Sequence, residues 1–211
     1  TVDNSYIIPD VYVFKHEGDY VILLNEEGMP RLKINPVYRR MLRGASGLSD
    51  QEKGYLEDKF RSAVWLIRSI EQRNHTIYKT AQSILKFQRD FLDKGLNYLK
   101  PLTLRQVAED IQMHESTVSR VTTNKYMSTP RGIVELKFFF SSGVARADGE
   151  SCSSVSVREM IRKFVAEEDP KSPYSDQQIT EYLKQNKIEI ARRTIAKYRK
   201  ELHIPSAVRR K

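Results

Sequence analysis

Cysteine is nearly absent from this sequence of 211 residues, which has Cys152 alone. One cysteine excludes a framework of internal disulfides and is typical of a reducing compartment. Because Cys152 stands among serines in a loop-like stretch, we interpret it as a bystander thiol and not as a nucleophile. No apolar run approaches the roughly 20 residues of a membrane span, and the N-terminus carries no secretory signal. The sequence therefore predicts a cytoplasmic protein without a membrane association.

Motifs of the common enzyme classes are missing as well. The chain has neither a GxxxxGK[ST] phosphate loop nor a GxGxxG turn after a strand. With one cysteine and four scattered histidines, no spacing suits a zinc site, and each histidine is most simply a surface or capping residue. We expect no enzymatic activity, no cofactor and no metal.

Positive charge is concentrated at the C-terminal end. The formal net charge is +9, and residues 191–211 contain eight lysines and arginines against the single acid Glu201, which leaves +7 there. Such a patch attracts polyanions, and DNA binding driven by it would weaken with salt. A solvated basic tail is the alternative, unless the charges are ordered on one structured face.

Residues 1–99 combine a β-like start with longer helical patterns. Apolar residues over 11–14 and 20–24, with Glu17-Gly18-Asp19 between them, predict a hairpin. Ser49 and Glu52 match a capping box at the start of a helix. Two apolar stripes at helical spacing follow and predict two helices of a helical bundle. The first stripe is Leu56, Phe60, Ala63, Ile67 and Ile70, and the second is Ile77, Ala81, Ile84 and Phe91.

The rest of the chain divides by composition. Residues 100–142 form a second unit, opened by Pro101 and closed near Phe138-Phe139-Phe140. Residues 143–156 are rich in glycine and serine, which is typical of a flexible linker. Residues 157–211 form the third unit. The second and third units each contain a helix-turn-helix pattern, so we expect a mainly α protein with a small β-hairpin element, a helical bundle and two helix-turn-helix units.

The first helix-turn-helix candidate runs from Leu104 to Thr123. Its first helix has one apolar face, made by Leu104, Val107, Ala108 and Ile111, and its second helix is anchored by Val118 and Val121. Gln112 occupies the turn position that needs a left-handed backbone, where glycine is usual, at a cost of about 1 kcal/mol.

The exposed N-terminal end of that second helix would enter the major groove. It carries Glu115, Ser116, Ser119 and Arg120, and an arginine can bond guanine through paired donors. His114 is a candidate N-cap that could also lie near phosphates. A plain helical hairpin with no DNA partner is the alternative.

The second candidate runs from Ser175 to Leu202. Ser175 and Gln178 match a capping box, and the apolar face of the first helix is made by Ile179, Tyr182 and Leu183. Asn186-Lys187 supplies the turn, with Asn186 better suited to the left-handed conformation.

In its second helix the predicted buried stripe is Ala191, Ile195, Tyr198 and Leu202. Basic residues share the opposite side, an order that a tail would not require. Arg192 and Arg193, nearest the N-terminal end, are our candidates for base edges, and Lys197, Arg199 and Lys200 are candidates for the phosphate backbone. Tyr198 would pack, with its hydroxyl within reach of a phosphate. Two unequal recognition helices on one chain would read two unequal elements in fixed order, about one helical turn apart.

Residues 191–200, ARRTIAKYRK, closely resemble the RpoN box ARRTVAKYRE, the signature of the sigma-54 family of bacterial RNA polymerase sigma factors. Ile195 here replaces valine and Lys200 replaces glutamate. Residues 113–126, 129–132, 135–143 and 204–206 are similar to the same family, so the likeness covers essentially the whole chain and is weakest before residue 100. Gln112 and Lys187 depart from turn glycines that are common in the family, which affects local stability rather than function.

The resemblance implies a function for each part. The RpoN box would read the GG of the −24 element of double-stranded promoter DNA, through Arg192, Arg193, Thr194, Lys197, Tyr198, Arg199 and Lys200. The first helix-turn-helix would act at the GC of the −12 element, through His114, Glu115, Ser116, Thr117, Ser119, Arg120 and Lys125. Residues 1–99 would bind core RNA polymerase.

The family also has a glutamine-rich region through which an enhancer-bound ATPase activator acts. This sequence has no counterpart of it, so we expect polymerase and promoter binding, in the nitrogen-regulation class of bacterial nucleoid-associated factors, without activator-dependent control. A helix-turn-helix repressor or recombinase module unrelated to polymerase is the alternative. A repressor would usually be symmetric and would need no large polymerase-binding region, and a recombinase would need a catalytic cluster that is missing here.

Overall fold

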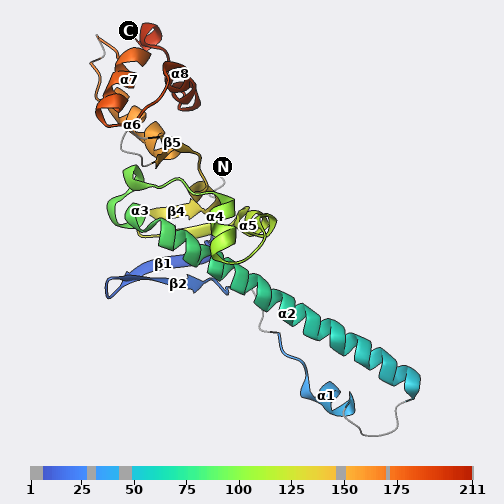
Figure 1. Ribbon diagram of the computed structural model, residues 1–211. Helices are drawn as coiled ribbons and strands as arrows, with labels where there is room; N and C mark the ends of the chain where they lie inside the picture. Colours follow the sequence, from blue (N-terminus) through green and yellow to red (C-terminus); the bar gives the residue numbers. More distant parts are fainter. Residues whose placement is uncertain (1–6, 28–31, 43–48, 146–150, 170–171, 211) are drawn as a thin grey trace, which may run out of the picture.

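The computed structural model describes residues 7–27, 32–42, 49–145, 151–169 and 172–210. Helices predominate in these residues, and the strands are short (Figure 1). The mainly α class is confirmed, and each predicted helix-turn-helix is a pair of consecutive helices. None of the helices in the described ranges combines the length and the hydrophobicity that crossing a bilayer requires.

The elements follow one another in this order: β1 (Val11–His16), β2 (Asp19–Leu24), α1 (Pro36–Leu42), α2 (Asp50–Phe87), α3 (Arg89–Lys94), the 3-10 helix η1 (Leu96–Tyr98), α4 (Leu104–Asp110), α5 (Glu115–Thr122), β3 (Tyr126–Thr129), β4 (Gly132–Glu135), the 3-10 helix η2 (Leu136–Phe139), β5 (Gly143–Ala145), β6 (Ser151–Ser153), α6 (Ser154–Ala166), α7 (Asp176–Gln185), α8 (Arg192–Glu201) and α9 (Ala207–Arg210).

The N-terminal hairpin forms as predicted, and it also joins a larger sheet. β1 and β2 pair antiparallel around Glu17 and Gly18, whose φ values of 49° and 93° suit a two-residue hairpin turn. The other edge of β1 pairs in parallel with β3, which gives the strand order β2-β1-β3-β4. This pairing brings residues 11–12 beside residues 127–128.

One hydrophobic core joins the hairpin, the C-terminal part of α2 and the first helix-turn-helix. Val11, Ile84, Val118 and Met127, from β1, α2, α5 and β3, have no exposed surface in it. The boundary that we expected after residue 99 therefore falls inside a single core. The reason is that an isolated two-stranded hairpin is at best marginally stable, so it packs on elements that come later in the chain.

α2 is one helix of 38 residues, where the two apolar stripes had suggested two helices. Between Ile70 and Ile77 the sequence has no glycine or proline, so nothing ends the helix there. The predicted capping box is confirmed: the Ser49 hydroxyl accepts from the backbone N–H of Glu52, and the Glu52 carboxylate accepts from the backbone N–H of Ser49 at 2.8 Å. Phe91, expected on the second helix, lies in α3.

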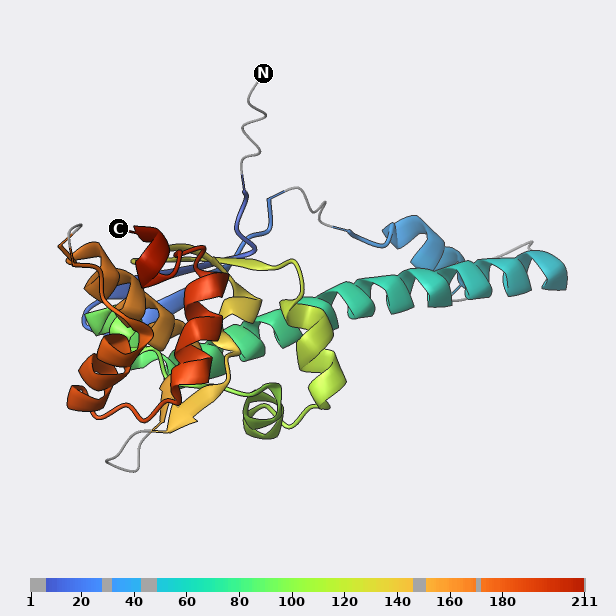
Figure 2. The same cartoon turned by 90° about the horizontal axis from the view of Figure 1, so that it is seen from above.

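The N-terminal half of α2 extends away from the core (Figures 1 and 2). The five residues of the first apolar stripe are only half-buried there, and α1 lies against this part of the helix. In the described part of residues 1–99, the expected bundle is replaced by one long helix, α2, with α1 beside its outer half and the short α3 and η1 after it. Trp65, the one tryptophan of the sequence, is 70% exposed on it.

The C-terminal unit has a core of its own, built from α6, α7 and α8 around Ile161, Ile179 and Ile195. The segment that composition suggested as a flexible linker, 143–156, is regular structure wherever it is described. β5 and β6 pair antiparallel within it, and α6 begins at Ser154. Glycine and serine are needed here for packing and hydrogen bonding, which a count of residue types does not reveal.

We predict that Met127→Ala lowers the free energy of unfolding by about 2–5 kcal/mol, because Met127 is fully buried where β1 pairs with β3. Chemical denaturation followed by far-UV circular dichroism measures the change. Ile133→Ala on the neighbouring strand β4 is the matched control, since Ile133 is 50% exposed and should lose much less. Equal losses in the two variants would contradict a core shared between β1 and β3.

Candidate nucleic-acid interface

The first helix-turn-helix consists of α4 and α5. α4 begins with a capping box of Thr103 and Gln106 that the sequence reading did not identify. Gln112 has a φ of 56°, so its predicted left-handed conformation is confirmed. The Met113 backbone N–H donates to the Ala108 carbonyl at 2.9 Å, which makes the turn a Schellman motif with glutamine at the position that glycine usually occupies.

α5 presents a polar, solvent-exposed face that runs from its first turn to Arg120 in its last. His114 is its N-cap, as predicted: Nδ1 accepts from the backbone N–H of Ser116 at 3.2 Å and lies 2.7 Å from the Ser116 hydroxyl. Glu115, Ser116 and Arg120 are exposed, whereas Thr117 and Ser119 are half-buried. This face carries hydroxyls and one arginine, a mixture suited to hydrogen bonding with bases and phosphates.

Lys125 lies outside this face. Its ammonium is 3.2 Å from Asp10 Oδ1, and the other carboxylate oxygen of Asp10 accepts from the backbone N–H of Tyr126 at 3.0 Å. Lys125 therefore tethers the start of β3 to the residue before β1, and its place among the DNA contacts stays a prediction. Sequence reasoning could not find this, because the partner lies more than a hundred positions away.

An ion pair attaches the first helix-turn-helix to α2. The Lys86 ammonium donates to Asp110 at the end of α4, and this hydrogen bond lowers the pKa of the Asp110 carboxyl. Because the carboxyl titrates lower in the folded state, the pair contributes stability above about pH 4, which is lost as the pH falls further. The contact adds to the hydrophobic core in which Ile84 of α2 packs with Val107 of α4 and Val118 of α5.

The second helix-turn-helix consists of α7 and α8. The capping box of Ser175 and Gln178 is confirmed. The left-handed residue in the turn is Lys187, with a φ of 62°, and the expectation for Asn186 was wrong. Asn186 instead caps α7 at a φ of −84°, and the Ile188 backbone N–H donates to the Leu183 carbonyl at 2.9 Å. These bonds form a second Schellman motif, which places the strained position one residue later than we expected.

Four cations project from α8 into solvent. Arg192, Arg193, Lys197 and Lys200 are all exposed, and Thr194 and Ala196 beside them are half-buried. Lys197 is 3.9 Å from Glu201, and no described acidic side chain pairs with the other three. The basic face is therefore an ordered feature of a helix and not a solvated tail.

Arg199 does not belong to this face, although we expected it at phosphates. It is 7% exposed, and Nε donates to Asp176 Oδ1 at 2.8 Å while Nη1 donates to the Ile204 carbonyl at 2.8 Å. This clamp joins α8 to the first residue of α7 and to the chain beyond α8, so Arg199 positions the recognition helix. The signal was present in the sequence, since Arg199 follows the buried Ile195 by four positions and shares its side of the helix.

Tyr198 also faces inward. Its ring lies 5.5 Å from the guanidinium of Arg158 on α6, which in turn donates to Glu201 at 3.2 Å. The predicted packing role of Tyr198 agrees with this position. Two arginines thus orient α8: Arg158 holds it against α6, and Arg199, on the inner side of α8, holds it against α7.

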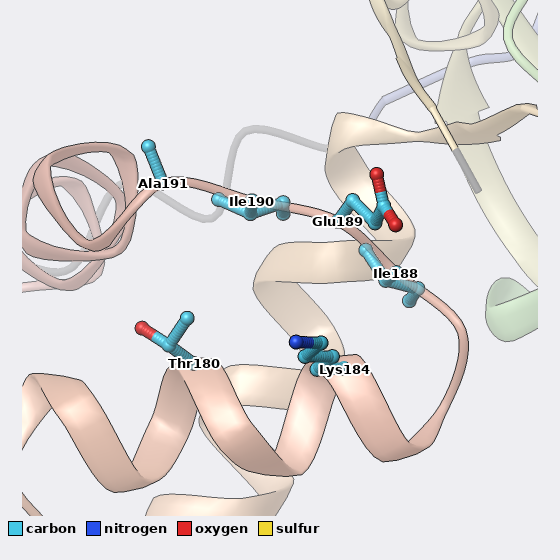
Figure 3. Close-up of a pocket in the computed structure, with 6 residues that line it drawn as sticks. All are labelled: Thr180, Lys184, Ile188, Glu189, Ile190 and Ala191. Carbon is cyan, nitrogen blue, oxygen red and sulfur yellow. The ribbon is translucent and has the colours of Figure 1, made fainter. Parts of the chain in front are cut away.

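A shallow pocket of about 420 Å³ lies between α7 and the segment that leads into α8 (Figure 3). Thr180 and Lys184 rise from α7 toward Ile190 and Ala191 in the opposite wall.

Ala191, expected in the buried stripe, is exposed and is the N-cap of α8. No three His, Cys, Asp or Glu side chains in the described part of the chain could hold a metal ion. The exposed polar and basic side chains make the outer surface of α5 and α8 the candidate interface.

Comparison with protein families gives two matches. The family described as "Sigma-54, DNA binding domain" matches residues 53–211, and "Sigma-54 factor, core binding domain" matches residues 1–38. The first of these covers both helix-turn-helix units and nearly all of α2.

Individual relatives agree with these matches. The RNA polymerase sigma-54 factor of Azotobacter vinelandii is 47% identical over 209 residues, which are 99% of this chain and 41% of that protein. The factor of Escherichia coli is 43% identical over 211 residues, 100% of this chain and 44% of that protein. The chain thus spans about two fifths of the length of these relatives. A crystal structure of Aquifex aeolicus sigmaN bound to promoter DNA is similar in fold, with a TM-score of 0.61 and 33% identity over 98% of this chain and 61% of that chain.

We predict that Arg199→Ala lowers the free energy of unfolding by about 3 kcal/mol, because it leaves Asp176 without its buried partner. Chemical denaturation followed by circular dichroism measures the loss. Lys200→Ala is the matched control, because the neighbouring side chain is exposed and a substitution there should change stability by less than about 0.5 kcal/mol. A stable Arg199→Ala protein would show that the clamp is not needed to hold α8.

Proposed function

The chain belongs to the sigma-54 family, and from this premise we propose that it recognises −24/−12 promoter DNA and binds core RNA polymerase. The observation that carries the proposal is the division of α8 into a buried side, with Ile195 and the Arg199 clamp, and an outer side with four exposed cations. A helix fixed in this way can enter a DNA groove without rearranging.

The basic face of α8 is our candidate for the −24 element. Arg192 and Arg193 lie in its first turn, at the end that a recognition helix inserts into the major groove. Their donors can bond the O6 and N7 atoms of the two guanines. Thr194, Lys197 and Lys200 lie farther along or at the rim and suit the phosphate backbone.

The exposed face of α5 is our candidate for the −12 element. Arg120 is exposed in its last turn and Glu115 and Ser116 in its first, while His114 caps the helix and Ser119 and Thr117 lie at the edge of the face. This surface has fewer cations than α8, so we expect it to bind more weakly on its own and to depend on α8 for its position on the duplex. The similar fold of a sigmaN bound to promoter DNA supports the proposal that α5 and α8 bind one duplex together.

For polymerase binding we propose the outer face of the N-terminal sheet. Phe14 on β1 and Leu23 on β2 are 41% and 53% exposed and lie on the side of the hairpin that faces away from the core. An exposed apolar patch of this kind is typical of a protein interface. The match of the core-binding family to residues 1–38 supports this assignment and argues against a regulator unrelated to polymerase.

The main test is fluorescence anisotropy with labelled duplexes that carry GG and GC elements about a turn apart, against duplexes in which either element is scrambled. We predict that Arg192→Ala and Arg193→Ala each weaken binding to the GG duplex about tenfold or more and reduce discrimination against the scrambled GG. Unchanged discrimination in both variants would remove these arginines from base recognition.

Lys197→Ala is the matched control on the same helix. It should weaken binding to all duplexes by a similar factor and reduce the slope of log affinity against log salt by about one. If it lost affinity for the cognate duplex alone, its assignment to a phosphate would be wrong.

For the second partner, we predict that the combined change Phe14→Ser and Leu23→Ser weakens binding to core RNA polymerase about tenfold and leaves duplex affinity unchanged. Gel filtration and a competition titration with core RNA polymerase measure this. Val208→Ser removes an 85% exposed apolar residue from the C-terminal unit and should have no effect on polymerase binding. An equal effect of both changes would argue against the sheet face.

A further inference from the structure

The serines before and within the first turn of α6 are buried. The exposed fractions are 0% for Ser153, 4% for Ser154 and 0% for Ser156, in a stretch whose composition suggested a flexible linker. A hydroxyl shielded from water must find hydrogen-bond partners inside the protein. For these serines the partners lie mainly before residue 143, in the part of the structure that contains the first core and is called the first unit from here on. These partners are residues before α4 or after η2.

Ser156 and Ser153 bond across the junction between the two units. The Ser156 hydroxyl donates to the Leu96 carbonyl at 2.8 Å and lies 3.4 Å from the Leu99 carbonyl, so it ties α6 to η1. The backbone N–H of Ser153 donates to the Leu99 carbonyl at 3.3 Å, and its hydroxyl lies 2.7 Å from that of Ser141. The side chain of Ser153 also caps α6.

Backbone contacts strengthen the same junction. The Ser154 N–H donates to the Ser142 carbonyl at 3.0 Å. A β-bridge between Leu102 and Ser141, on the near side of the junction, holds the residue whose hydroxyl contacts Ser153. At Gly143 a Cβ atom would lie 3.3 Å from the side chain of Pro101, which is tight, so glycine lets the start of β5 come close to the first unit.

α6 contributes to both cores, and β5 lies between the two units. Val155 packs against the first core, and Val157, two positions later, is fully buried in the second. The Ala145 carbonyl in β5 accepts from the backbone N–H of Glu189, just after the turn of the second helix-turn-helix, at 3.4 Å. A tilt of one unit against the other would therefore break several buried hydrogen bonds at once.

We propose that this serine joint, defined as Ser141, Ser153, Ser154 and Ser156, sets the distance and rotation between α5 and α8 and so makes the spacing of the two promoter elements a determinant of specificity. The inference rests on the proposed function. One added base pair moves an element along the duplex by about 3.4 Å and turns it by about a tenth of a rotation. A rigid joint must strain itself or the DNA to follow that change, whereas a loose linker follows it freely.

The test uses the 211-residue chain and a series of duplexes in which the GG and GC elements differ in spacing by single base pairs. The unaltered chain should bind its best-spaced duplex at least tenfold more tightly than duplexes one base pair longer or shorter. In the double variant Ser153→Ala and Ser156→Ala, which removes the hydroxyl bond to the Leu96 carbonyl and the hydroxyl contact with Ser141, this ratio should fall to about threefold or less. Affinity for duplexes with one element scrambled should stay the same.

Ser62→Ala is the matched control, because that hydroxyl donates to the Asp58 carbonyl within α2 and to no other residue that the structure describes. It should retain the full spacing preference. A double variant with the same preference as the unaltered chain, or an unaltered chain that tolerates altered spacing while binding each element, would overturn the role of the joint. Failure of the unaltered chain to prefer either element over its scrambled form would instead overturn the proposed function, and the inference with it.

Amide hydrogen exchange gives a readout that needs no DNA. The N–H groups of Ser153 and Ser154 donate across the joint, so they should be protected in the unaltered chain and exchange at least tenfold faster in the double variant. The amides of Ile84 and Ile195, one in each core, should keep their protection, which shows that both units remain folded. Unchanged protection at the joint would count against the proposal, and general loss of protection would call for the single variant Ser156→Ala in the same measurement.

Discussion

The parallel pairing of β1 with β3 is the constraint on which the first unit depends. Parallel neighbours cannot be joined by a tight turn and need a long crossover connection. Here that connection contains α2, α3, η1 and the whole first helix-turn-helix. α5 therefore packs into the first core, where Val118 is buried together with Val11 and Met127 of the sheet. The position of the candidate −12 reader follows from the pairing of two short strands.

The signature segment at residues 191–200 divides its charges between two tasks. Arg192, Arg193, Lys197 and Lys200 point to solvent, where they suit a polyanion, while Arg199 is buried against Asp176. A buried guanidinium is tolerated only where its donors are matched, and here a carboxylate and a carbonyl accept from it. The four exposed cations can serve DNA recognition because the buried Arg199 holds α8 in place.

Most local features were predictable from the sequence because their causes are local, although the equally local capping box of Thr103 and Gln106 was missed. The capping boxes at Ser49 and Ser175, the hairpin turn at Glu17 and Gly18, and the left-handed Gln112 each depend on residues within a few positions. The basic face of α8 follows from helical periodicity in the same way. Even the misplaced Asn186 was wrong by one residue only.

Features with distant partners were not predictable in this way. The tether of Lys125 to Asp10 and the bond of Ser156 to Leu96 join residues that are far apart in sequence. Glycine and serine in residues 143–156 suit a flexible linker and a tightly packed junction equally well, and only the neighbours decide between them. The continuity of α2 was missed for another reason, since two apolar stripes on one helix have the same pattern as two helices.

The exposure of Trp65 determines what the intrinsic fluorescence of this protein reports. Tryptophan emission shifts when the indole ring moves between water and an apolar interior, and this ring is already 70% exposed on the outer half of α2. Unfolding of either core would change its surroundings little, so a fluorescence melt would be nearly silent while the helices disappear. The ring belongs to the part of α2 that extends away from the core, and it would respond chiefly to a molecule that covers this part of the helix. The chain thus contains a natural optical probe for that one surface.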